Sequence, residues 1–119
     1  MPPFEIQVFV PSRTISPRVS RARVDMAATS EPTYRAAVHC LVTFDERASL
    51  PSIRVPVLCL AGEHDPNAPA AMMQRMAAKI PGARYVCLAG VGHLPNLEAP
   101  QAFDAAVLEF LTQASAPAG

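Results

Sequence analysis

Two titratable residues follow directly after short apolar runs, and their types are those that activate a nucleophile. Asp65 comes just behind Gly62, at the end of the run Val55–Ala61. His93 follows a second run, Ala83–Ala89, across a glycine-rich turn. A carboxylate can hold an imidazole in one tautomer, and that imidazole can then take a proton from a third group. The spacing therefore makes Asp65 and His93 candidate acid and base of a nucleophilic mechanism.

A strand–helix–strand unit is needed to bring this pair together. Short apolar runs closed by turn residues are typical of strands that are buried on both faces in a parallel sheet. Between the two runs, Ala70–Ile80 carries its methionines and Ile80 at helical spacing. A right-handed crossover leaves the two strands parallel, with their C-terminal ends on one rim. We therefore expect an α/β fold in which Asp65 and His93 meet at that rim.

A paired motif extends this pattern on both sides. It reads I-x-V-P-V-L-x-L-A-G-E-H-D-x-x-x-P from Ile53, and then G-x-G-H-x-x-x-x-E-x-P-x-x-F from Gly90. The pair resembles the C-terminal part of the α/β-hydrolase superfamily, and it is most similar to 3-oxoadipate enol-lactonase-like hydrolases, over about residues 53–111. The resemblance implies that Asp65 is the acid of a catalytic triad and that His93 is its general base.

The nucleophile of that fold has no counterpart in this sequence. The fold places serine, aspartate and histidine in that order, with the serine on a G-x-S-x-G turn, and no serine here is flanked by glycines. The resemblance implies a partial α/β-hydrolase fold, with a cap-like helical segment at 1–50 and the hydrolase portion at 51–113. The small and proline-containing sequence at 114–119 predicts a disordered tail. We expect either a natural short protein or an N-terminally truncated product of a longer gene.

Three functions are compatible with these motifs. The first is hydrolysis of a small-molecule ester or lactone through a serine outside this sequence. The second keeps the fold but uses an aspartate nucleophile in the missing part, as dehalogenases and epoxide hydrolases do. The third is a catalytically inactive fragment or interaction module. The turn that carries the nucleophile would distinguish the first two functions, and it is not in this sequence. All three functions therefore stay open at the level of the sequence.

The composition of the chain limits the classes of partner and cofactor that we expect it to bind. The ten basic and ten acidic residues balance, which gives no electrostatic case for nucleic acid or an anionic membrane. No apolar run approaches the roughly 20 residues that span a bilayer. Cys40, Cys59 and Cys87 lack metal or redox spacing, and we expect Cys59 and Cys87 to be buried in the two strands. We expect no cofactor or metal, a cytoplasmic location, and self-association through an exposed sheet edge.

The N-terminal half is expected to be mostly helical. Phe4–Val10 alternates as a short strand does, and Val19–Ala28 is a plausible short helix. Ser30 is a helix cap ahead of an apolar stripe. That stripe consists of Tyr34, Val38, Leu41 and Val42. The arginines form a cluster that we interpret as a solvated helix face. The cluster consists of Arg13, Arg18, Arg21 and Arg23.

Other polar residues receive structural interpretations. His39 lies beside the helical stripe, and His64 is scaffold next to Asp65. Glu98 lies where the final helix should begin, and a carboxylate there suits the helix dipole. The final helix should bury one apolar stripe. Its members are Phe103, Val107, Phe110 and Leu111.

Overall fold

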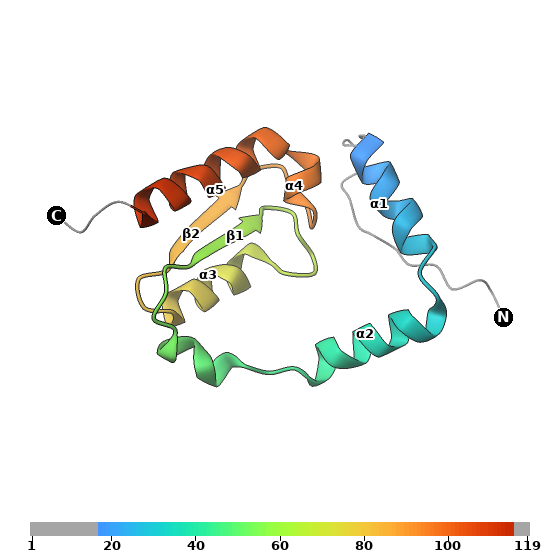
Figure 1. Cartoon of the computed structure of the whole chain (residues 1–119), viewed down its shortest axis with the longest axis horizontal. Coiled ribbons are helices and arrows are strands. Elements are labelled where there is room, and N and C mark those ends of the chain that lie inside the picture. Colours follow the sequence, from blue (N-terminus) through green and yellow to red (C-terminus); the bar gives the residue numbers. More distant parts are fainter. Residues whose placement is uncertain (1–16, 116–119) are drawn as a thin grey trace.

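The computed structural model describes residues 17–115. Its centre is a parallel pair of strands, β1 (Leu58–Gly62) and β2 (Arg84–Leu88), connected by helix α3 (Ala70–Lys79). Leu58 lies opposite Arg84 and Gly62 lies opposite Leu88, so the strands run in register and end together. The expected βαβ unit is therefore confirmed (Figure 1).

Strand β1 begins three residues later than the apolar run from which it was predicted. Val55 lies in a bend and is 65% exposed. Pro56 has no N–H group to donate to a ladder, which delays pairing. The carbonyl of Val57 is the first to be used, and it accepts the N–H of Arg84 at 2.9 Å.

One face of the strand pair packs against α3 (Figure 1). The centre of this core consists of Cys59 on β1 and Ala77 and Ile80 on or next to α3. Tyr85 of β2 packs against the same cluster, and its hydroxyl donates to the carbonyl of Ala70 at 3.1 Å. Helix α3 is thus fixed to both strands, and it sets the distance between the two loops that follow them.

The C-terminal helices close the opposite side (Figure 1). The short α4 (Pro95–Glu98) leads into α5 (Pro100–Ala114), which packs against β2. Arg84 ties α5 to the strand by donating to Gln113 and to Glu109. The predicted apolar stripe of α5 is half-buried at three positions, and its last member, Leu111, is 51% exposed instead.

Cys87 was predicted to be buried, and this was wrong. Cys87 is exposed, whereas Cys59, on the same face of the sheet, is only 3% exposed. Both strands lie at an edge of the two-stranded sheet among the described residues, so edge position alone does not separate the two cysteines. Helix α3 packs mainly over β1 and leaves the end of β2 uncovered. Strand membership alone does not bury a side chain, because burial also requires an element that covers that face of the strand.

The described N-terminal elements are helices α1 (Pro17–Ala27) and α2 (Glu31–Thr43) and the 3-10 helix η1 (Arg47–Ser52). Ser30 caps α2 as expected, because its hydroxyl oxygen accepts the N–H of Thr33 at 3.4 Å. The apolar stripe of α2 is not buried, since Leu41 and Val42 are each 74% exposed. The helix follows an extended path away from the sheet, where no described element covers it (Figure 1).

Helix α1 differs from α2 because it contacts α4, next to the loop that carries His93. Three arginines of the predicted basic cluster lie on α1 and are largely exposed, and Arg21 pairs with Asp25 at 3.0 Å. The fourth, Arg13, and the strand predicted at Phe4–Val10 lie outside the described residues. Among residues 17–115, no helix has the length and apolar character needed to cross a membrane.

Candidate functional site

The end of β1 delivers Asp65 in a tight turn. The N–H of Asp65 bonds to the carbonyl of Gly62 at 3.2 Å. Its own Oδ1 then accepts the N–H groups of Asn67 at 2.8 Å and Ala68 at 3.0 Å. A side-chain carboxylate that binds backbone amides two and three residues onward fixes the turn that leads into the next helix. The Asp65 side chain is thereby held by its own loop, independently of its contact with His93.

The loop after β2 lies directly against the loop after β1. The N–H of His64 donates to the carbonyl of Val91 at 2.8 Å. At Gly62 a side chain has no room, because a Cβ atom would lie 2.2 Å from the carbonyl oxygen of Gly92 and 2.7 Å from that of Val91. Glycine is needed here for the close approach of two backbones. This approach brings the two loops within side-chain reach.

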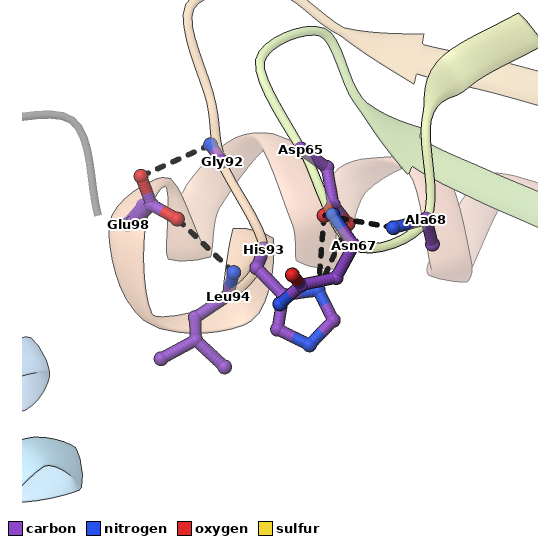
Figure 2. Close-up of polar contacts among 7 residues, drawn as sticks. All are labelled: Asp65, Asn67, Ala68, Gly92, His93, Leu94 and Glu98. Atoms are coloured by element: carbon purple, nitrogen blue, oxygen red, sulfur yellow. Dashed lines mark hydrogen bonds and ion pairs between the residues drawn. The ribbon is translucent and has the colours of Figure 1, made fainter. Parts of the chain in front are cut away.

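Three backbone amides of the second loop are bound by carboxylates. Gly90, whose φ is 69°, donates its N–H to Glu63 Oε2 at 2.6 Å. The N–H of Gly92 donates to Glu98 Oε1 at 3.0 Å, and that of Leu94 donates to Glu98 Oε2 at 3.1 Å. The backbone on both sides of His93 is therefore tied to one side chain (Figure 2).

Asp65 and His93 face each other, as expected. The Nδ1 atom of His93 lies 3.0 Å from Oδ2 and 3.1 Å from Oδ1 of Asp65 (Figure 2). An ionised carboxylate only accepts hydrogen bonds, so this contact assigns the proton to Nδ1 and leaves Nε2 unprotonated in the neutral ring. The Asp65 side chain is 7% exposed and that of His93 is 40% exposed. A sheltered carboxylate thus orients an imidazole that is partly exposed to solvent.

The pKa of the Asp65 carboxyl reflects this environment. Burial raises the pKa, but the hydrogen bonds from His93, Ala68 and Asn67 favour the ionised form and together hold the pKa below its usual value. Asp65 is therefore charged at neutral pH. A charged Asp65 can stabilise the imidazolium that forms when His93 accepts a proton, which is the role of the acid in a triad.

The other histidines do not join this pair. The Nε2 atom of His64 lies 3.6 Å from Glu63 and the side chain is 56% exposed, while His39 lies on α2. Within residues 17–115 no three His, Cys, Asp or Glu side chains gather in a way that could hold a metal ion. Sequence reasoning missed the role of Glu98 as a tether of the His93 loop. The signal was the position of Glu98 in the motif that follows His93. The sequence analysis explained this carboxylate by the helix dipole alone.

Comparison with known families matches this arrangement. The model of the alpha/beta hydrolase family matches residues 2–106. This chain therefore belongs to the alpha/beta hydrolase family.

A polyketide synthase, an esterase and an enol-lactonase are among the proteins that this chain resembles. The chain is 43% identical over 73 residues to polyketide synthase ThaQ of Burkholderia thailandensis, which covers 61% of this chain and 4% of the synthase. It is 31% identical over 96 residues to pimeloyl-[acyl-carrier protein] methyl ester esterase of Aromatoleum aromaticum, covering 81% and 38%. The enol-lactonase of Burkholderia xenovorans superposes with a TM-score of 0.75 at 34% identity, covering 79% and 36%.

These shares have a direct meaning for function. The chain spans less than two fifths of the length of the esterase and of the enol-lactonase that it matches. The similarity to an enol-lactonase confirms the family expected from the paired motif. Whatever those longer proteins do as a whole comes to this chain only as a proposal.

Proposed function

We propose that this chain supplies the acid and base of a hydrolase that cleaves a small-molecule ester or lactone. The observation that carries the proposal is the 3.0 Å contact between His93 Nδ1 and the Asp65 carboxylate, on a histidine whose side chain is 40% exposed. His93 would take the proton of an attacking serine and return it to the leaving alcohol. The esterase and the enol-lactonase among the relatives support this choice of substrate.

The serine and the oxyanion donors must come from polypeptide outside these 119 residues. The sequence holds no G-x-S-x-G turn. An aspartate–histidine pair without a positioned nucleophile and oxyanion donors stabilises no tetrahedral intermediate. The 119-residue chain alone is therefore expected to hydrolyse p-nitrophenyl esters no faster than its His93→Ala variant. Rapid turnover that disappears in His93→Ala would instead require a nucleophile within this sequence.

A chimera tests the proposal directly. The C-terminal part of the Burkholderia xenovorans enol-lactonase is replaced by this chain, so that the lactonase supplies its own preceding portion. Hydrolysis of the enol-lactone and of p-nitrophenyl acetate is then measured. Asp65→Asn should lower kcat by roughly 10⁴-fold, because the imidazole is no longer held in the tautomer with its proton on Nδ1. His93→Ala should lower kcat at least as much.

Matched controls change the same residue types elsewhere. Asp104→Asn alters an exposed aspartate on α5, and His39→Ala alters an exposed histidine on α2. Both should keep kcat within about twofold of the unmodified chimera. A folded chimera whose turnover survives His93→Ala would refute the assignment of His93 as the base.

A further inference from the structure

The carboxylate of Glu98 binds the two amides that flank His93. Its Oε1 accepts the N–H of Gly92 at 3.0 Å and its Oε2 accepts the N–H of Leu94 at 3.1 Å (Figure 2). Both oxygens are used, one on each side of a single residue. Hydrogen bonds to an ionised acceptor are stronger than neutral ones, so this is a firm two-point attachment of the His93 backbone.

The environment of Glu98 supports an effect on His93 rather than on α4 alone. Glu98 is half-buried at the end of α4, and its side chain reaches back over the whole length of that helix. On the opposite side, the backbone of Gly92 lies against Gly62, where no Cβ atom fits. The loop is thus blocked by Gly62 on one side and held by Glu98 on the other.

We infer that Glu98 is a positioning residue that holds the His93 imidazole against Asp65. This inference rests on the proposed function for its catalytic meaning, since Glu98 touches neither the imidazole nor any reacting atom. Without Glu98 the amides of Gly92 and Leu94 lose their acceptors, and the backbone of His93 is free to turn. The imidazole then spends less time within hydrogen-bond distance of the carboxylate.

The competing explanation is that Glu98 only stabilises the first turn of α4. Under that explanation its removal lowers the free energy of unfolding but leaves the Asp65–His93 contact intact. The two explanations differ in a property of Asp65, because His93 is one of the groups that lower the pKa of that carboxyl. A positioning role predicts that the contribution of His93 shrinks when Glu98 is removed, while the contributions of Asn67 and Ala68 persist.

The experiment is a titration of the 119-residue chain in which aspartate carries carbon-13 at its carboxyl group. Asp65→Asn assigns the Asp65 signal by its loss. The pKa of Asp65 is measured in the unmodified chain, in Glu98→Ala, in His93→Ala and in the double variant. Asp45, whose pKa is held at about 2 by Arg47, is an internal reference in the same spectra.

The expected result is an upward shift of the Asp65 pKa in Glu98→Ala that is no larger than the shift in His93→Ala. The double variant should show the same Asp65 pKa as His93→Ala alone, because two changes that act on one interaction are not additive. An Asp65 pKa in Glu98→Ala that matches the unmodified chain would overturn the inference. Additive shifts in the double variant would overturn it as well.

Two further variants keep the test decisive if Glu98→Ala does not fold. Glu98→Gln retains one acceptor oxygen and should give a smaller upward shift of the same sign. Glu109→Gln, at an exposed glutamate on α5, is the matched control and should give none. No shift in a folded Glu98→Gln protein would then overturn the inference.

The outcome is independent of catalysis. All measurements use the chain itself and need no substrate. An inactive chimera with a Glu98-dependent Asp65 pKa would refute the proposed function and leave the positioning role standing. An active chimera whose Asp65 pKa ignores Glu98 would do the reverse.

Discussion

Asp65 performs two structural tasks with one carboxylate. Its Oδ1 binds the amides of Asn67 and Ala68, and both of its oxygens lie within reach of His93. The sequence predicted Asp65 as a candidate acid, and the structure adds that the same carboxylate fixes the turn that leads to the next helix. A carboxylate that is fixed by its own loop has little freedom left to lose when it orients the imidazole. That arrangement favours preorganisation of the pair.

Asp65 should make stability depend on pH in the acid range. Its pKa in the folded chain lies below the usual value of 3.8, so the unfolded chain binds the proton more readily. The stabilisation is present above about pH 4 and is lost as the pH falls further. Asp65→Asn should cost about 1–3 kcal/mol of unfolding free energy at pH 7, and it should flatten the decline in acid.

Urea unfolding at pH 7, 5, 4 and 3 measures both effects of Asp65→Asn. Asp104→Asn, at an exposed position on α5, is the matched control. The explanation fails if Asp65→Asn loses as much unfolding free energy between pH 5 and pH 3 as the unmodified chain.

Gly62 should be intolerant of even one methyl group. In Gly62→Ala the added Cβ would lie 2.2 Å from the carbonyl oxygen of Gly92, and both are backbone-anchored atoms that cannot rotate aside. The loops must separate, which should cost about 1–3 kcal/mol of unfolding free energy. The same separation should abolish the upward effect that His93→Ala has on the Asp65 pKa.

Gly82→Ala is a contrasting control, because a Cβ at Gly82 meets no atom within 4 Å. Its φ of 69° should still produce backbone strain, at a cost of about 1 kcal/mol. Only Gly62→Ala should disturb the Asp65 pKa. Equal disturbance by both substitutions would show that the effect is general destabilisation.

At the scale of elements, the sequence predicted what local patterns determine. The two apolar runs, the helical spacing between them and the turns with Gly62 and Gly90 defined the βαβ unit and the rim where Asp65 and His93 meet. Local patterns did not determine which faces are covered. Cys87 and the stripe of α2 are exposed because burial depends on a neighbouring element, and no described element lies there.

The role of Glu98 was missed for a related reason. A carboxylate near a helix start fits the helix dipole, and nothing local shows that its oxygens turn back to Gly92 and Leu94. That contact depends on the path of the loop, which in turn depends on the packing of Gly62 against it. The tertiary path of the loop therefore determines which groups Glu98 binds, although its residue type and its spacing from His93 can be read from the sequence.

Thiol reactivity should report which strand α3 covers. Cys59 is buried, and burial raises the pKa of its thiol, whereas Cys40 and Cys87 are exposed. Reaction depends on the thiolate and on access. At pH 8, Cys40 and Cys87 should react with iodoacetamide at least tenfold faster than Cys59, as followed by peptide mass spectrometry. Comparable rates at Cys59 and Cys87 in the folded chain would contradict the placement of α3.

At the scale of the whole molecule, the outer edges of the strand pair have no neighbouring strand in the part of the chain that the structure describes. Strand β1 pairs with β2 on one edge, and the described chain places no strand on its other edge. Leu58 and Leu60 of β1 remain partly exposed. Half of all residues in the sequence are hydrophobic, so these two apolar side chains are not exposed for want of other apolar residues. An open edge with apolar side chains is a template for pairing with another chain. Among residues 17–115 the sheet is thus well formed at the Asp65–His93 rim and unpaired along the other edge of β1.

This edge leads us to propose self-association of the isolated chain at micromolar concentration. Sedimentation velocity over a dilution series should show dimers or larger species that dissociate on dilution. Leu58→Lys places a charge on the edge strand and should weaken association at least tenfold. Leu108→Lys is the matched control, because Leu108 is 63% exposed on α5, away from that edge. Association that survives Leu58→Lys but not Leu108→Lys would assign the interface to α5, and a monomer at every concentration would show that the chain covers its own edge.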